Sequence, residues 1–267
     1  MMARFTDPHY LKTEQYRDET NLNARLELHR RFSTNPYGWF PWIFDTLESL
    51  PSPARVLELG CGPGYLWVEC IDRVPGGWSI TLSDLSGGML DAAWRNLVVT
   101  GRAFKFEQID AQSIPYPDET FDIVIANHML YHVPDRPKAL AEICRTLKSG
   151  GYFIATTVGD GHLAEINQWL KQVSPDTGFA PSANTFTLDN GLEQLTPFFS
   201  QVEIKRYDDD LRVTEVEPLM TYIRSTFRVK ELSEPALANV RQELENLLRA
   251  RDEIFVTKDS GLFKAVK

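Results

Sequence analysis

The sequence predicts a doubly wound α/β fold, in which helices cover both faces of a mostly parallel sheet. Two observations lead to this prediction. Short apolar runs alternate with helical patterns from residue 51 onward, and a glycine-rich segment follows the first run. Strands that alternate with helices of this length build parallel sheets. Right-handed crossovers then place helices on both faces.

The first 50 residues are expected to form a helical lid rather than a linker. Leu22, Leu26 and His29 recur at helical spacing and share one face, with Arg25 beside them. A second helical pattern covers residues 39–47, where the aromatic side chains are more typical of a core than of a cofactor site.

Seven strands are expected in the sheet. Each apolar run is short and bounded by turn residues, as in strands buried on both faces. The helix that contains residues 138–148 is expected to end at Gly150-Gly151. The first six runs occupy residues 54–60, 78–84, 104–110, 121–127, 152–158 and 201–207.

The remainder of the chain divides into a core and an insertion. Residues 51–212 and 252–267 are assigned to the core, which includes the last strand, and residues 213–251 to a helical insertion before that strand. We expect one compact unit, in which the insertion caps the acceptor site through residues such as Tyr222, Arg224 and Phe227.

The glycine-rich segment, ELGCGPG at residues 58–64, indicates a ligand site. Its glycines allow a tight turn and close approach of a ligand to the backbone, and the next helix offers unpaired N–H groups. A nucleotide-type cofactor is therefore expected at the carboxyl end of the first strand. Tyr65 stands where the dinucleotide fingerprint requires glycine, so the G-x-G-x-x-G pattern is broken.

Composition narrows the class of protein. The chain has 267 residues, 43% of them hydrophobic and 24% charged, and no run of about 18 apolar residues that could span a bilayer. The charged N-terminus lacks the apolar segment of a secretory signal, so a cytoplasmic location is expected. Three cysteines without metal-ligand spacing predict neither a disulfide framework nor a metal site.

The net charge of −9 is unevenly distributed, because residues 51–200 carry 10 basic and 17 acidic side chains. Such a surface repels a phosphate backbone. A small-molecule partner is expected, with no nucleic acid and no membrane, in a monomer or homodimer.

Four ordered motifs identify a family resemblance. ELGCGPG is followed by SDLSGGML at residues 83–90, by residues 109–133 and by LKSGGYF at residues 147–153. Together they resemble class I methyltransferases dependent on S-adenosyl-L-methionine (SAM), of the small-molecule, UbiE-like type. The resemblance implies a Rossmann-like sheet of seven strands and the product S-adenosyl-L-homocysteine.

The resemblance also implies which residues hold the cofactor. Asp84 would accept hydrogen bonds from the ribose, although an N-cap role for the next helix has the same signature. Apart from the resemblance, we hypothesise that the N-terminal lid folds over the sulfonium, with Tyr16 offering an aromatic face and Arg25 pairing with the methionine carboxylate, unless Arg25 is a surface charge. The remaining cofactor-binding candidates are Glu58, Gly60, Cys61, Gly62, Gly64, Leu85, Met89, Asp110, Ala111 and Asn127.

On the acceptor side, His132 and then His128 are the candidates for catalysis, against a packing role for each. The expected reaction is in-line transfer of a methyl group to N or O of a small molecule, with no metal. One alternative is a catalytically inactive methyltransferase-like regulatory module. The other is a nicotinamide-dependent oxidoreductase, which Tyr65 and the lack of a Ser/Tyr/Lys triad disfavour.

Overall fold

The structure is a computed structural model that describes residues 6–173, 185–226 and 232–267. None of the helices in these ranges combines the length and apolar character that a bilayer crossing requires. Phe227, which the sequence placed in the acceptor site, lies outside the described residues.

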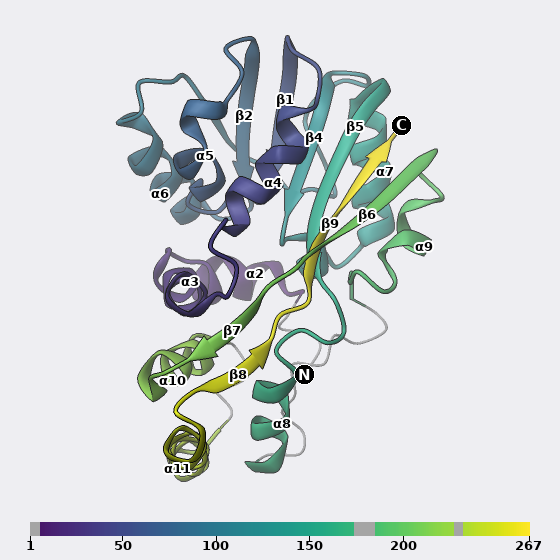
Figure 1. The fold of residues 1–267 in the computed structure, drawn as a ribbon. Helices are drawn as coiled ribbons and strands as arrows, with labels where there is room; N and C mark the ends of the chain where they lie inside the picture. Colours follow the sequence, from purple (N-terminus) through teal and green to yellow (C-terminus); the bar gives the residue numbers. More distant parts are fainter. Residues whose placement is uncertain (1–5, 174–184, 227–231) are drawn as a thin grey trace.

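A seven-stranded sheet in the order β3-β2-β1-β4-β5-β9-β6 forms the centre of the molecule (Figure 1). The five strands from β3 to β5 run parallel, whereas β9 is antiparallel to both of its neighbours. The predicted fold class is thereby confirmed. The strands are β1 (Ala54–Leu59), β2 (Trp78–Asp84), β3 (Lys105–Gln108), β4 (Phe121–Asn127), β5 (Leu147–Val158), β6 (Gln201–Tyr207) and β9 (Ser260–Val266).

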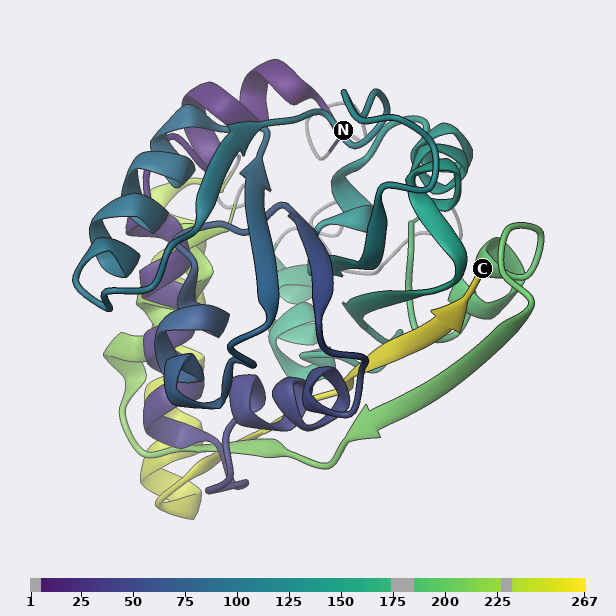
Figure 2. The same cartoon turned by 90° about the horizontal axis from the view of Figure 1, so that it is seen from above.

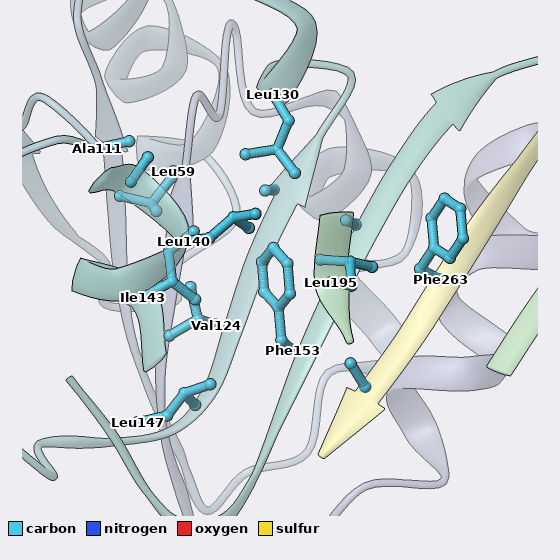
Figure 3. Packing of buried hydrophobic residues seen from close by; sticks show 14 of the residues in the cluster. Leu59, Ala111, Val124, Leu130, Leu140, Ile143, Leu147, Phe153, Leu195 and Phe263 are labelled. Carbon is cyan, nitrogen blue, oxygen red and sulfur yellow. The ribbon is translucent and has the colours of Figure 1, made fainter. Parts of the chain in front are cut away.

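Helices cover both faces of the sheet (Figure 2). One face packs against α4 (Trp39–Glu48), α5 (Tyr65–Glu69) and α6 (Gly87–Val98). A short 3-10 helix, η2 (Ile71–Arg73), follows α5 in the chain. The other face packs against α7 (Arg136–Thr146) and α9 (Gly191–Leu195), and Figure 3 shows part of this cluster. Adjacent residues of β1 and β4 are buried on opposite faces, as the period of a strand requires.

The end of α7 differs from the prediction. The helix ends at Thr146, and Leu147 already pairs with Phe121 as the first residue of β5. The register then shifts, so that Tyr152 pairs with Ile123. Gly150, with a φ of +73°, provides the left-handed conformation at this irregularity rather than a helix C-cap.

Three short or medium elements precede α4. They are α2 (Pro8–Tyr10), the π-helix η1 (Leu11–Gln15) and α3 (Thr20–Phe32). We refer to residues 6–33 as the lid, because α2 and α3 lie beyond the end of the sheet that carries the glycine-rich segment (Figure 1). Gly38, with a φ of +94°, connects this region to α4.

A second unit, which we call the cap, comprises α8 (Ala164–Val173), β7 (Asp210–Val213), α10 (Val216–Ser225), α11 (Glu234–Arg251) and β8 (Ile254–Thr257). It shares a hydrophobic cluster with α3. Residues 252–257 were expected in the core, but β8 pairs with β7 in a separate two-stranded sheet. The antiparallel pairing of β6 with β9 continues beyond a short break into β7 and β8, and this ribbon carries the chain out to the cap (Figure 1).

Candidate functional site

A cavity of about 1030 Å³ lies between the carboxyl ends of the central strands, the lid and the cap. Most sequence-predicted site residues line it, although they come from segments far apart in the chain. Those lining residues are Tyr16, Arg25, Glu58, Gly60, Cys61, Gly62, Asp84, Leu85, Met89, Asp110, Ala111, Asn127, His128 and His132. Gly64 is not among the lining residues.

The glycine-rich segment adopts a backbone that favours glycine at three positions. The φ angles of Gly60, Gly62 and Gly64 are +69°, +53° and +75°. A Cβ atom at Gly60 would lie 2.8 Å from the Cβ of Met129, and one at Gly64 would lie 2.9 Å from the Cδ1 of Leu97. The loop therefore packs too closely for side chains and leaves backbone exposed to the cavity.

Asp84, the last residue of β2, contacts the backbone of the glycine loop. Its Oδ2 accepts the Gly62 N–H at 3.0 Å, and its Oδ1 accepts the Ser86 N–H at 2.8 Å. Burial raises the pKa of Asp84 to about 6, and these backbone donors oppose the rise. Ser86, and not Asp84, is the N-cap of α6, since its hydroxyl accepts the Met89 N–H.

Glu58, in β1, is 1% exposed. Its carboxylate accepts one bond from the Trp67 indole N–H and another from the Asn127 amide at 2.7 Å. Burial raises the pKa of Glu58 to about 7. The other amide atom of Asn127, Oδ1, is buried and has no hydrogen-bond partner among the described residues.

The acid after β3 has a more open setting. Asp110 is exposed at the cavity edge, and its carboxylate accepts the Gln112 N–H at 2.9 Å. The neighbouring Ala111 is buried, as is Met89 in the first turn of α6. Leu85 and Met89 thus present apolar surface between the two acids Asp84 and Asp110.

The lid is attached to the first turn of α6. The Ser86 hydroxyl donates to the Tyr16 carbonyl at 2.7 Å. The Arg17 carbonyl lies so close to Gly88 that a Cβ there would be 1.9 Å from its oxygen. Further along, the Tyr65 hydroxyl donates to the Asn23 side chain at 2.6 Å.

Two candidate residues meet across the lid and the core. The Tyr16 hydroxyl lies 2.9 Å from Nε2 of His132, and the two rings stand edge to face. The Arg25 guanidinium lies 5.4 Å from the Tyr16 ring centroid, and its Nε donates to the Asn21 carbonyl. Its Nη2 is buried without a hydrogen-bond partner among the described residues.

Three further histidine positions shape the cavity on the cap side. His29 in α3 and His162 before α8 stack at 6.4 Å between ring centroids, and His128 lies 5.3 Å from Trp39. Burial lowers the pKa of His128 to about 4 and that of His162 to about 3, and that of His29 well below its ordinary value. His128 also has a φ of +48°, a strained conformation that often marks functional positions.

A buried ion pair closes this side. The Lys258 ammonium pairs with Asp209, and the two side chains are 6% and 0% exposed. Asp209 also accepts from the Ser33 and Thr34 hydroxyls and from the Asn35 N–H. We call Asp209, Lys258 and residues 33–35 the clasp. Asp209 lies in the break between β6 and β7, and Lys258 lies in the break between β8 and β9, so the clasp joins the end of the lid to both strands of the ribbon.

Sequence reasoning missed part of the cavity. His29 and Trp39 were read as packing residues, and His162 and Lys258 were not considered. Four of the five histidines, all except His9, line this one cavity, and because they are far apart in the sequence no local pattern indicated that they would meet. Tyr222 lines it as expected, whereas Arg224 is exposed and does not. The described residues contain no group of three side chains suited to a metal ion.

Comparison with known proteins agrees with this geometry. The family model described as "Methyltransferase domain" matches residues 57–155. Ubiquinone/menaquinone biosynthesis C-methyltransferase UbiE of Xanthomonas oryzae is 34% identical over 115 residues, which are 42% of this chain and 45% of that protein. Mitochondrial arginine-hydroxylase NDUFAF5 of Rattus norvegicus is 28% identical, over 57% of this chain and 43% of its own. The chain thus spans less than half the length of these curated relatives.

Among solved structures, phosphoethanolamine N-methyltransferase 2 of Haemonchus contortus is similar over 98% of this chain and 60% of its own length. Its TM-score is 0.59 at 21% identity, and it was solved with phosphomonomethylethanolamine and S-adenosylhomocysteine. At this identity the likeness shows a shared fold.

Proposed function

Because residues 57–155 match the family model described as "Methyltransferase domain", we propose that this protein transfers a methyl group from SAM to a small-molecule acceptor. One observation carries the proposal. The glycine loop and Asp84 line the same cavity as a second, histidine-rich region. Such a cavity accommodates a cofactor and an acceptor side by side.

The residues present fit SAM. The left-handed backbone of the glycine loop leaves room for the cofactor to approach. Asp84 retains lone pairs beyond its two backbone bonds, so it can accept from ribose hydroxyls. Asp110 and the Ala111 N–H would hold the adenine, which would lie against Leu85 and Met89.

The methionine end would lie between the glycine loop and the lid. Asn127 Oδ1, buried without a partner, is placed to accept from the cofactor ammonium, with the Glu58 carboxylate beside it. Arg25 Nη2 is a buried donor without a partner and would pair with the carboxylate. The Tyr16 ring, already in contact with a cation, offers its face to the sulfonium.

Bound SAM supplies an electrophilic methyl group. The protein then has to hold the acceptor atom about 3 Å from that carbon, in line with the breaking bond, and to exclude water. The lid lies over the cavity and would exclude water. His132, hydrogen-bonded to Tyr16, is the proposed acid or base on the acceptor side, because a neutral imidazole can take a proton from the attacking group.

The acceptor atom remains part of the proposal. From the sequence we expected the acceptor atom to be nitrogen or oxygen. The curated relative UbiE is named a C-methyltransferase, so carbon is a third candidate. Each of these atoms attacks by the same in-line geometry, so the cofactor side of the site is independent of the choice.

The test begins with cofactor binding, measured by calorimetry with SAM and S-adenosylhomocysteine. Asp84→Asn is expected to weaken binding roughly 10- to 100-fold, since it removes hydrogen bonds to a charged acceptor. Asp91→Asn, an exposed position on α6, is the matched control and should leave affinity unchanged. The thermal midpoint of each unliganded variant reports whether it folds.

Three results would contradict the proposal. Absence of SAM binding removes it, and NADH binding in its place would favour an oxidoreductase. Equal SAM affinity of the native protein and the folded Asp84→Asn variant would remove the assigned site. Tight SAM binding without turnover over a broad panel of alcohols, amines and carbon acids would identify an inactive module.

A further inference from the structure

The part of the cavity that the cofactor would leave free is defined by five residues, which we call the histidine chamber. They are His29, His128, His162, Trp39 and Tyr222, and all five line the cavity. They come from α3, the segments after β4 and before α8, and helices α4 and α10. No single motif encodes them, so the chamber exists only in the folded chain.

Flat rings form the walls of the chamber. Tyr222 stands edge to face against His29 at 6.0 Å, and Trp39 lies against His128 at 5.3 Å. His29 also stacks on His162. Walls of this kind favour a planar ligand, because aromatic rings pack best in offset or edge-on contact.

One atom of the chamber lacks a partner. Nδ1 of His29 is buried and has no hydrogen bond among the described residues. A buried polar atom of this kind costs free energy unless a ligand or water satisfies it. The ligand is therefore expected to carry a group that can donate to, or accept from, an imidazole.

Charge is divided between the two ends of the cavity. The lining carboxylates are Glu58, Glu69, Asp84 and Asp110, all from the segments around the glycine loop and β2–β3. The chamber side instead has Lys258, whose charge is balanced by Asp209, because Arg25 is assigned to the carboxylate of the cofactor. A cationic ligand in the chamber would find no free carboxylate among the described lining residues, whereas the cationic cofactor would find several.

The protonation states of the chamber histidines also favour an uncharged ligand on this side. Burial and the nearby positive charges of Lys258 and Arg25 lower the pKa of His29 and His128, so both imidazoles are neutral at pH 7. A neutral imidazole has one donor and one acceptor nitrogen. It can hydrogen-bond to a hydroxyl group but cannot balance the charge of an ammonium.

We propose that the histidine chamber binds the methyl acceptor as an uncharged planar ring bearing a hydroxyl group, a phenol or an enol, and discriminates against ammonium compounds. This inference rests on the proposed function, because it names the acceptor of the same reaction. Three observations on the described residues support it together: the chamber's aromatic walls, the unpartnered His29 nitrogen and the absence of a free carboxylate from the chamber end of the lining.

The transfer balances with groups already present. The hydroxyl proton moves to the imidazole of His132, the base of the proposed function, which lines the same cavity, as an oxygen lone pair forms the new oxygen–carbon bond. The carbon–sulfur bond breaks at the same time, and its electron pair stays on sulfur, which becomes a neutral thioether. The imidazolium then releases its proton to solvent, so no oxidant or further reactant is needed.

The test measures binding of matched probes by calorimetry, to the full chain saturated with S-adenosylhomocysteine at pH 7. The probes are 4-methylphenol, benzylamine and toluene, which have similar size. We expect 4-methylphenol to bind at least about 10-fold more tightly than either of the others. His29→Leu should remove most of that advantage, while His9→Leu, an exposed position outside the cavity, should keep it.

Each outcome decides the inference. Benzylamine binding as tightly as the phenol would overturn the charge argument, and an unchanged preference in folded His29→Leu would overturn the role of the chamber. Failure of the cofactor to bind contradicts the proposed function and with it the role of the ligand as methyl acceptor, whereas the probe preference of the unliganded chain still tests which ligand the chamber prefers. Normal cofactor affinity in His29→Leu shows that any loss is confined to the acceptor side.

Discussion

The Glu58 carboxylate illustrates how a single residue couples the site to stability. It is buried, receives two side-chain hydrogen bonds, and has a pKa raised to about 7. Since the folded protein holds this proton more tightly than the unfolded chain, the free energy of unfolding falls as pH rises between about 4.5 and 7. Ionisation of this buried carboxylate therefore costs stability as the pH rises.

Glu58→Gln is expected to flatten this pH dependence. The amide keeps an acceptor for the Trp67 N–H, and a rotated Asn127 amide can accept from its NH₂ group. The variant should be more stable than the native protein at pH 8, by up to about 3 kcal/mol, with little difference at pH 4. Urea unfolding of the unliganded proteins at both pH values measures this.

Glu69→Gln, an exposed position on the neighbouring helix, is the control and should leave the pH profile unchanged. Some slope will persist in the Glu58 variant, because burial also raises the pKa of Asp84 to about 6. A native profile in Glu58→Gln would show that Glu58 does not carry a raised pKa.

The sequence predicted the positions of some site residues but not the side-chain partners of others. Asp84 and Asp110 were located by sequence because each stands at or just beyond the carboxyl end of a strand, and the carboxyl ends of parallel strands meet at one edge of a sheet. The partners of Glu58 were not, because Trp67 and Asn127 reach it from a helix and a neighbouring strand. A local pattern does not record such side-chain contacts.

Among the elements, the junction of the lid with α6 depends on one glycine. The Arg17 carbonyl occupies the space that a side chain at Gly88 would need, whereas nothing lies within 4 Å of a Cβ at the adjacent Gly87. Both glycines lie in the first turn of the same helix. Their similar helix propensity and different surroundings make them a matched pair.

Gly88→Ala should detach the first part of the lid without unfolding the sheet, since backbone at 1.9 Å from the new Cβ must move. We expect faster amide hydrogen exchange in residues 6–32 and weaker SAM binding, with core exchange unchanged. Gly87→Ala should leave lid exchange and affinity as in the native protein. Equal lid exchange in the two variants would contradict the close contact.

Element boundaries depended on long-range pairing. The helix pattern at residues 138–148 correctly indicated α7, but its last residues pair with β4 and start β5 instead. Likewise β8 resembles a core strand in sequence, yet its partner β7 lies outside the main sheet. Tertiary context decides such ends, because several extra residues are compatible with either state.

At the scale of the whole molecule, the clasp connects the lid, the sheet and the cap. The Asp209 side chain is fully buried and bonds to Lys258, to Ser33 at the end of the lid, and to the next two residues, Thr34 and Asn35. Removing its charge leaves the Lys258 ammonium buried without a counter-ion, which is far more costly than losing an exposed pair.

Asp209→Asn is therefore expected to lower the free energy of unfolding by about 3 to 5 kcal/mol. Thermal or urea unfolding measures the loss, and exposed Asp208→Asn next to it is the control. Because the clasp also holds the cap-side wall of the cavity, acceptor-probe binding should weaken in any folded fraction of the variant. A change below about 1 kcal/mol, as for a surface pair, would show that the clasp is not a buried ion pair.

The sequence by itself determined the α/β class, the order of the strands along the chain and the position of the glycine loop with its acids. These features depend on local periodicity and on residues at strand ends, which short segments encode. Only the tertiary structure decided which side chains share the cavity with them. His29, His162 and Lys258 converge from opposite ends of the chain, and their meeting depends on how the lid and cap pack, which is a property of long-range contacts.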